Sequence, residues 1–374
     1  MSIKKAKIFL KAKLEKRKEK LIARTRYKEI ILNSEQFRLL SLTDGKRSVR
    51  DLAGLTKRKI NRILKDITEL EESGVVEFRL LCESPDLKTL YERRCSIDGI
   101  YKGHPAFSNI IAYEREWGIY PSVLDFLDKK SENYKLKNFE KEIYLDIIRP
   151  FLNRMTGHSQ IIDVGGGIGR FAVNLARMSH SIHLVDSSEI ALKKALRHFL
   201  DENLDNFDLH WGDAGNLSMF SDNTFDAALA IELICYSDNP DKVVKELARV
   251  TKKNGLIIIS VEGKYGGVLS EPNVSFDKLS SILQDDLLYI KNHLYVYYYT
   301  PESLKRLLEK CGVKIIDIFG SHYLADGIFH KLINMDKLDD KNYKKDVFKI
   351  ERLCQKDPVL KNFARAWVAV GRKN

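Results

Sequence analysis

Cysteine is scarce in this chain, and long apolar runs are absent. The cysteines are scattered, their number is odd, and no two form a Cys-x-x-Cys pair: Cys82, Cys95, Cys235, Cys311 and Cys354. This usage gives no support for a disulfide framework or a zinc site, so we expect free thiols, no bound metal and a cytoplasmic location. No run approaches the roughly 18 apolar residues that a membrane-spanning helix needs, so we expect no membrane partner.

Most of the chain also lacks an excess of charge of one sign. Of the 374 residues, 63 are Lys or Arg and 52 are Asp or Glu, which gives a net charge of +11. Residues 1–30 hold twelve basic and three acidic side chains, so the rest of the chain is nearly neutral. The basic balance therefore does not by itself indicate a nucleic-acid-binding protein. With 44% hydrophobic residues, the composition is typical of a globular protein, and the length favours two or three domains.

Three regions follow one another along the sequence. Residues 1–28 form a basic arm, in which Ile8, Leu10, Leu14, Leu21 and Ile22 could make a loose apolar stripe on a helix. Its charges indicate either a solvated face or an attraction to acidic partners. Residues 29–100 are interpreted as a winged-helix-like module. Residues 101–374 alternate strand and helix patterns, with an insertion at about 321–364 that has helices of its own.

The winged-helix prediction depends on helices followed by a strand. A short strand ends near Leu32, Asn33 or Ser34 could cap the next helix, and Asp44-Gly45 indicates a turn. The third helix has one apolar face, formed by Ile60, Ile63, Leu64, Ile67 and Leu70. Its polar side is basic, which is typical of a solvated face and also compatible with contact to nucleic-acid phosphates.

The α/β region contains seven strand-like segments with helical patterns between most of them. They are residues 161–164, 182–185, 207–211, 225–231, 256–261, 313–319 and 365–370. The first of them runs into the glycine-rich turn Asp163-Val164-Gly165-Gly166-Gly167-Ile168-Gly169-Arg170. Glycine permits positive φ and close approach of a ligand, and the following helix offers free N–H groups. Because Asp163 precedes the glycines and Arg170 holds the third dinucleotide position, the turn suits a zwitterionic ligand better than a pyrophosphate.

Acidic side chains follow the next strands at the same edge of the expected sheet. Asp186 ends the second strand, where a carboxylate can accept both ribose hydroxyls. Asp213 follows the third strand, placed to accept an adenine amino proton, and Glu232 follows the fourth. Ligands of open α/β sheets bind at this carboxyl edge.

Residues 160–262 resemble a class I S-adenosylmethionine-dependent methyltransferase. The matching segments are DVGGGIG, HLVD, GDA, FDAALAIELICY, DKVVKELARV and TKKNGLIIIS, followed later by TPESLKRLLEKCGV. The resemblance implies an α/β fold with a Rossmann-like seven-stranded sheet and helices on both faces. It also implies S-adenosylmethionine as cofactor and S-adenosylhomocysteine as product. The cofactor-binding residues that it implies are Asp163, Gly165, Gly166, Gly167, Gly169, Asp186, Ser187, Asp213, Ala214 and Glu232.

The acceptor is less defined, because one expected residue is missing. O-methyltransferases of small molecules with a similar turn place a catalytic His after the fourth strand, whereas this chain has Glu232-Leu233-Ile234-Cys235-Tyr236. An acceptor that is already ionised, such as a carboxylate, needs no general base. The candidate catalytic residues are His293, Tyr113 and His322. Each of them can instead have a packing or surface role.

The N-terminal module also resembles the peptide-binding winged helices of enzymes that modify ribosomally made peptides. It does so through Asn33-Ser34, Asp44-Gly45, the apolar third helix and Gly74-Val75-Val76. In that family a leader peptide adds a strand to the small sheet, and a basic arm would favour an acidic leader. Our first hypothesis is therefore a methyltransferase of a peptide or peptide-like natural product. The alternatives are a nucleic-acid (RNA or tRNA) methyltransferase, a small-molecule O-methyltransferase that dimerises through its winged helix, and a ligand-sensing regulator.

Overall fold

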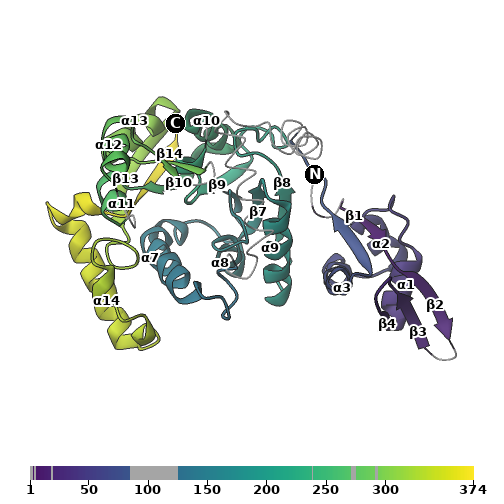
Figure 1. The fold of residues 1–374 in the computed structure, drawn as a ribbon. Helices are drawn as coiled ribbons and strands as arrows, with labels where there is room; N and C mark the ends of the chain where they lie inside the picture. The colour runs from purple at the N-terminus through teal and green to yellow at the C-terminus, as the bar shows by residue number, and fades with distance from the viewer. Residues whose placement is uncertain are drawn as a thin grey trace.

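A computed structural model describes residue 3 and residues 6–17, 20–84, 125–237, 239–270, 275–290 and 294–374. In these ranges the chain forms a large α/β domain and a smaller N-terminal unit beside it (Figure 1). No helix in the described ranges has the length and apolar character needed to cross a bilayer.

The large domain is built on one seven-stranded sheet with the order β13-β14-β10-β9-β6-β7-β8. Only β14 runs antiparallel to its neighbours. The strands are β6 (Gln160–Val164), β7 (Ser181–Asp186), β8 (Phe207–Trp211), β9 (Phe225–Ala230), β10 (Thr251–Glu262), β13 (Val313–Ser321) and β14 (Ala366–Lys373). All seven predicted strands are confirmed. The strand order reverses between β6 and β9, which is where ligands bind in open α/β sheets.

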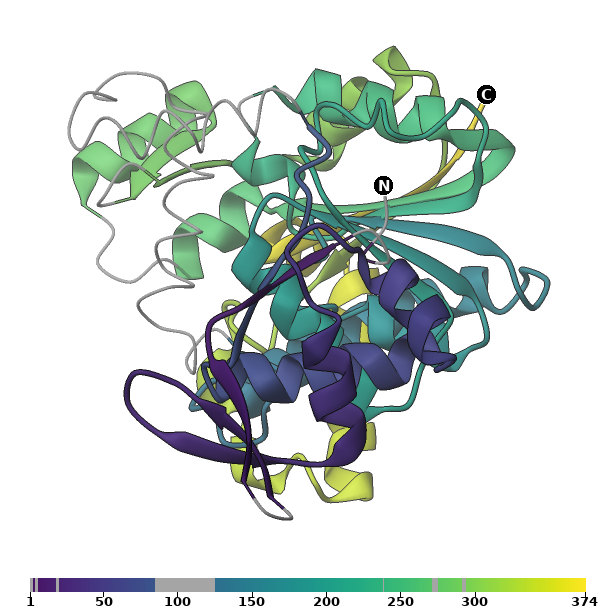
Figure 2. The same ribbon diagram turned by 90° about the vertical axis from the view of Figure 1, so that its right-hand side faces the viewer.

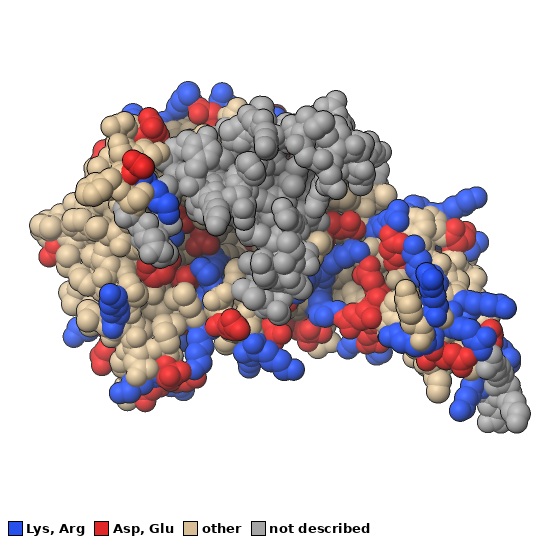
Figure 3. Space-filling model, in the orientation of Figure 1, with Lys and Arg blue, Asp and Glu red and all other residues tan. Residues whose placement is uncertain are grey.

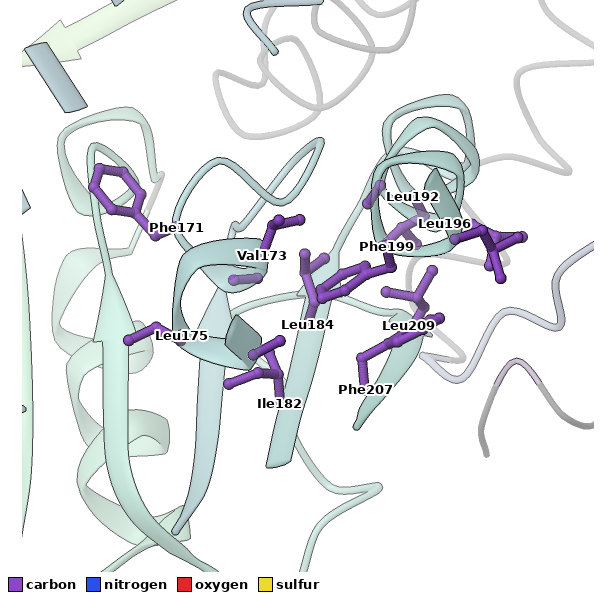
Figure 4. Packing of buried hydrophobic residues seen from close by; sticks show 14 of the residues in the cluster. Phe171, Val173, Leu175, Ile182, Leu184, Leu192, Leu196, Phe199, Phe207 and Leu209 are labelled. Atoms are coloured by element: carbon purple, nitrogen blue, oxygen red, sulfur yellow. The ribbon is translucent and has the colours of Figure 1, made fainter. Parts of the chain in front are cut away.

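Helices cover both faces of this sheet. Successive residues of a strand point to opposite sides, so the apolar residues of each strand need a covering layer on both faces. Ile182 and Leu184 of β7 pack against α8 (Ala172–Arg177) and α9 (Glu189–Asp201), as Figure 4 shows. Val185 belongs to the core on the other face, which also contains Val244 and Leu247 of α10 (Pro240–Val250). The remaining helices of the domain are α7 (Tyr134–Leu152), α11 (Lys264–Ser270), α12 (Phe276–Asp285), α13 (Pro301–Lys310) and α14 (Lys341–Lys356).

The segment between β13 and β14 contains α14. Asp340 caps α14 by accepting the backbone N–H groups of Asn342 and Tyr343. Three short 3₁₀ turns accompany it, at His330–Leu332, Met335–Lys337 and Leu360–Phe363. A separate two-stranded sheet, β11 (Leu287–Ile290) and β12 (Leu294–Tyr297), precedes α13.

The N-terminal unit has the helices that its sequence predicts. They are α1 (Ser34–Ser41), α2 (Val49–Thr56) and α3 (Ile60–Glu72). Asn33 and Ser48 form capping boxes at α1 and α2, and the predicted apolar face of α3 is buried at Ile63, Leu64, Ile67 and Leu70. Gly74 follows α3 with a φ of 71°, a conformation that glycine adopts without steric cost.

The expected helical stripe in residues 1–28 is wrong, because this segment forms strands. They are β1 (Lys7–Leu10), β2 (Lys13–Arg17) and β3 (Lys20–Arg24). β1 pairs with β5 (Val76–Arg79), and β2, β3 and β4 (Glu29–Leu32) form a three-stranded antiparallel sheet. Ile8, Ala23 and Leu32 are buried with the helices, so pairing between strands buries the apolar residues of this basic segment. It is therefore built into the N-terminal unit by strand pairing.

The N-terminal unit lies next to α9, beyond the β8 edge of the large sheet (Figures 1 and 2). The Asn61 side chain donates to the carbonyl of Leu204 at 3.0 Å, and Lys193 of α9 pairs with Glu71 of α3 at 2.8 Å. The carboxylate of Glu189 accepts the backbone N–H of Leu80 at 3.1 Å. Lys and Arg side chains project from this unit in Figure 3, in keeping with the charge of its sequence.

Candidate functional site

The glycine-rich turn follows the carboxyl end of β6, and its backbone has a conformation that favours glycine. Gly165, Gly167 and Gly169 have φ values of 70°, 52° and 82°. A Cβ on Gly165 would lie 2.7 Å from the side chain of Leu233, whereas a Cβ on Gly167 would meet no heavy atom of the described residues within 4 Å. Within the described part of the chain, Gly167 therefore leaves the space that a ligand held by the turn requires.

Asp186 connects this turn to the end of β7. Its Oδ2 accepts the backbone N–H of Gly167 and its Oδ1 that of Ser188, both at 2.8 Å. Burial raises the pKa of Asp186, while the backbone N–H groups of Ser188, Gly167 and Ser187 oppose that rise. The carboxylate predicted to hold a ribose thus also fixes the position of the glycine turn.

Asp163 lies beneath the turn and is 1% exposed. Burial, and secondly the nearby Asp186 carboxylate, raise its pKa to about 7, although Arg170 acts in the opposite direction. Among the described residues, its Oδ2 atom has no hydrogen-bond partner. A buried carboxylate oxygen of this kind is suited to receive a cationic amino group from a ligand.

The remaining predicted cofactor residues are found at the same carboxyl edge. Asp213 follows β8, and its Oδ1 accepts the backbone N–H of Gly215 at 3.0 Å. The carbonyl of Ser187 accepts the indole N–H of Trp211 at 2.8 Å, which links the ends of β7 and β8. Ala214 packs against the apolar core on the α10 face. The structure therefore places the predicted set along the carboxyl ends of β6, β7, β8 and β9.

Glu232 has the most constrained position in the set. Its φ is 55°, a left-handed conformation that costs a non-glycine residue energy and is often found at functional sites. The Ser260 hydroxyl accepts its backbone N–H at 2.8 Å. Arg170 donates to its Oε2 at 2.9 Å and, against the effect of burial, lowers the pKa of Glu232 to about 2.

Two residues of this network were missed by sequence reasoning, and both lie on α7. Tyr144 donates its hydroxyl to Glu232 Oε1 at 2.9 Å, and Arg170 lies 3.6 Å from Glu140 Oε2. Glu140 is 1% exposed. One signal was available: Glu140 shares the helical spacing of the apolar Ile143, Tyr144 and Ile147 stripe. A carboxylate within an apolar face needs a partner, and here Arg170 and Lys137 supply it.

Of the three candidate catalytic residues, His322 alone lies among the described residues. Tyr113 and His293 lie outside the described residues. His322 is 2% exposed, its Nε2 donates to the carbonyl of Glu140 at 3.0 Å, and its ring packs edge-on against Tyr144. In this position His322 packs against Tyr144, which donates to Glu232. A catalytic role for His322 stays a prediction.

Comparison with known proteins agrees with this geometry. A family model described as a methyltransferase domain matches residues 162–259, the segment that contains the glycine turn, Asp186, Asp213 and Glu232. The chain carries a class I S-adenosylmethionine-dependent methyltransferase domain. The residues fit the cofactor, since Asp163 offers a buried carboxylate oxygen and no described residue would contact a Cβ on Gly167. When bound, S-adenosylmethionine supplies a methyl group already activated by its sulfonium.

Relatives of the methyltransferase share a limited part of its length. The ubiquinone biosynthesis O-methyltransferase of Colwellia psychrerythraea is 27% identical over 180 residues, which cover 48% of this chain and 70% of that enzyme. The mitochondrial enzyme of Dictyostelium discoideum is 24% identical, over 44% of this chain and about half (52%) of its own. A solved Thermotoga maritima methyltransferase, titled a possible histamine N-methyltransferase, has 19% identity and a TM-score of 0.44, and covers 70% of this chain and 98% of its own.

We expect replacement of Asp163 by Asn to stabilise the cofactor-free methyltransferase at neutral pH. The folded-state pKa of Asp163 is raised, so the native protein loses stability as the pH rises from about 4 through 7, and Asn removes this loss. Urea unfolding should show a gain on the order of 2–4 kcal/mol at pH 8 that shrinks toward pH 4. Cofactor affinity should fall. Asp201→Asn, at an exposed position, is the control, and a gain that does not vary with pH would contradict the assignment.

Proposed function

We propose that this methyltransferase O-methylates a carboxylate of a peptide or peptide-like natural product. The observation that carries the proposal is the free edge of β4 in the N-terminal unit. Among the described residues β4 pairs with β3 alone, so its other edge offers backbone N–H and C=O groups to an added strand. Tyr27, just before β4, and Ile31, within it, are 88% and 67% exposed.

The charge near this edge favours an acidic peptide. Arg26 and Lys28 are exposed in the turn between β3 and β4, and the polar side of α3 adds Lys59 and Lys65. A basic surface of this kind attracts an acidic segment and raises the rate of association. Asn61, which donates to Leu204, and Glu71, which pairs with Lys193 of α9, hold the unit against the methyltransferase domain, so a peptide bound to it stays tethered to that domain.

The residues that follow β9, and Tyr144 beside them, favour an acceptor that is already ionised. No histidine stands among residues 232–237. Burial, and secondly the Glu232 carboxylate, raise the pKa values of the Tyr144 hydroxyl and the Cys235 thiol, so neither is a ready proton acceptor at neutral pH. A carboxylate acceptor requires no proton removal, and positioning supplies most of the acceleration.

A second candidate is O-methylation of a small molecule, which is favoured by relatives named ubiquinone biosynthesis O-methyltransferases. In that case the N-terminal unit would serve association between two copies of the chain. This reading predicts a phenolic acceptor that needs a base from outside the described residues.

Mass spectrometry distinguishes these acceptors. The full chain is incubated with S-adenosylmethionine and, in separate reactions, with acidic peptides, phenolic small molecules and RNA. We expect one added CH₂ on a peptide carboxyl group, lost on mild alkaline hydrolysis as an ester would be. Methylation of the phenols or of RNA alone would overturn the peptide proposal.

Two proline variants test the strand edge of β4. The N–H groups of successive residues in a strand point to opposite edges, so one of Ile30 and Ile31 donates toward β3 and the other outward. We expect one variant, Ile30→Pro or Ile31→Pro, to destabilise the small sheet, and the other to leave it folded but weaken peptide binding at least about 10-fold. Fluorescence anisotropy with a labelled peptide measures the second effect. Unchanged binding in both folded variants would contradict strand addition.

A further inference from the structure

A cluster of metal-ligand side chains lies on the large sheet, away from the glycine turn. β7 and β8 pair in parallel with His183 opposite Asp208 and Val185 opposite His210. Because alternate residues share a face, His183, Asp208 and His210 all point to the side opposite α8 and α9. One ligand atom from each of the three lies within 4.8 Å of the others.

The two imidazoles are held in an orientation that suits a shared ion. His183 Nδ1 lies 3.1 Å from His210 Nε2. The outer nitrogens face acceptors: His183 Nε2 lies 3.2 Å from Gln160 Oε1, and His210 Nδ1 lies 3.4 Å from Glu83 Oε2. If each neutral ring donates its proton outward, two lone pairs face each other across the gap, and a cation between them converts that repulsion into coordination.

The distances and surroundings favour a transition metal. Two nitrogens bound to a tetrahedral Zn²⁺ at its usual bond length are separated by about 3.3 Å, close to the separation of the two rings. An outward hydrogen bond to a carboxylate or amide oxygen is the usual support for a metal-bound histidine. The rings of Phe220 and Phe225 pack against the pair and limit access of water to it.

We propose that His183, His210 and Asp208 bind one divalent transition-metal ion, for which Zn²⁺ is the best match. Two imidazoles and one carboxylate are a donor set that Zn²⁺ accepts, with a fourth position left for water. One carboxylate oxygen of Asp208 lies within 4.8 Å of a nitrogen of each ring. The site departs from the expectation of no bound metal, which considered only cysteine spacing.

The position of the site indicates a structural role at the junction of the two parts of the chain. Glu83, the acceptor of His210, lies just after the N-terminal unit, and its backbone N–H donates to the carbonyl of Trp211 at 2.8 Å. The backbone N–H of Ile3 donates to Asp208 Oδ1 at 3.1 Å. Both ends of the N-terminal unit thus meet the cluster, so a bound ion would strengthen their attachment to β8.

Metal analysis of the untagged full chain tests the proposal. After purification without chelators we expect about one zinc per chain by plasma mass spectrometry. The metal-depleted chain should bind Co²⁺ with the absorption of a tetrahedral N/O site, and added Zn²⁺ should raise its melting temperature. A zinc content far below one per chain, with no Co²⁺ spectrum, would overturn the proposal. The contact between the two rings would then be a hydrogen bond with a proton between them.

Single substitutions distinguish the proposed metal ligands, His210 and Asp208, from Glu83, which accepts a hydrogen bond from His210. We expect His210→Asn and Asp208→Asn to lose zinc, and Glu83→Gln to weaken zinc affinity about 10- to 100-fold while the chain stays folded by circular dichroism. His158→Gln, at an exposed histidine, is the matched control. Equal zinc affinity in the wild type and in Asp208→Asn and Glu83→Gln would refute the site even if His210→Asn fails to fold.

Discussion

Calorimetry of the Asp186→Ala variant is expected to show no measurable binding of S-adenosylmethionine. The family resemblance assigns the ribose hydroxyls to this carboxylate, and two charge-assisted hydrogen bonds contribute about 3–6 kcal/mol, which corresponds to more than about 100-fold in affinity. The same carboxylate accepts the backbone N–H of Gly167 and Ser188, so its removal also releases the glycine turn. Both effects weaken the same site.

The control for this prediction is Asp201→Ala, because Asp201 is exposed at the end of α9. It should bind the cofactor as the wild type does. Asp186→Asn is informative as well, since an amide group presents a donor to one of the two N–H groups that the carboxylate accepts. Unchanged cofactor affinity in Asp186→Ala, with a native circular dichroism spectrum, would refute the placement of the pocket.

The second large effect concerns the folding stability provided by the ion pairs of Arg170 with Glu232 and Glu140. We expect Arg170→Met to lower the free energy of unfolding by about 3–5 kcal/mol, because it leaves Glu232 and Glu140 without their shared buried cation. Urea unfolding at pH 7 measures the loss. The double variant Arg170→Met/Glu232→Gln should recover part of it, since the uncompensated charge of Glu232 is then removed while Glu140 keeps its pair with Lys137.

The pH dependence of stability gives an independent test of the same pair. In the wild type the pKa of Glu232 is lowered, so the contribution of the pair is present above about pH 4.5 and is lost as the pH falls toward 2. In Arg170→Met the pKa of Glu232 should rise above its ordinary value, so stability should instead fall as the pH rises. Arg177→Met, which breaks an exposed pair with Glu202, should cost no more than about 1 kcal/mol. Equal losses in the two variants would contradict the buried network.

The sequence predicted the strands of the large sheet and the cofactor-binding residues at their carboxyl ends, because both depend on local patterns. Most strands of the large sheet contain a short apolar run, and Asp186 ends one strand while Asp213 comes two residues after another. The prediction for residues 1–28 failed for a related reason. A basic segment with few apolar residues has no strong period, and the pairing of β1 with β5, nearly 70 residues later, decides its conformation.

By itself, the sequence determined the α/β class, the methyltransferase resemblance and the carboxylates at the ends of β6, β7 and β8. Tertiary structure decided which distant charges meet. Glu140 of α7 reaches Arg170 only when α7 packs on the sheet, and His183 and His210 meet only through the register of β7 and β8. The physical reason is that burial and register, which fix the pKa of a carboxylate or the gap between two imidazoles, are properties of packed elements and not of spacing along the chain.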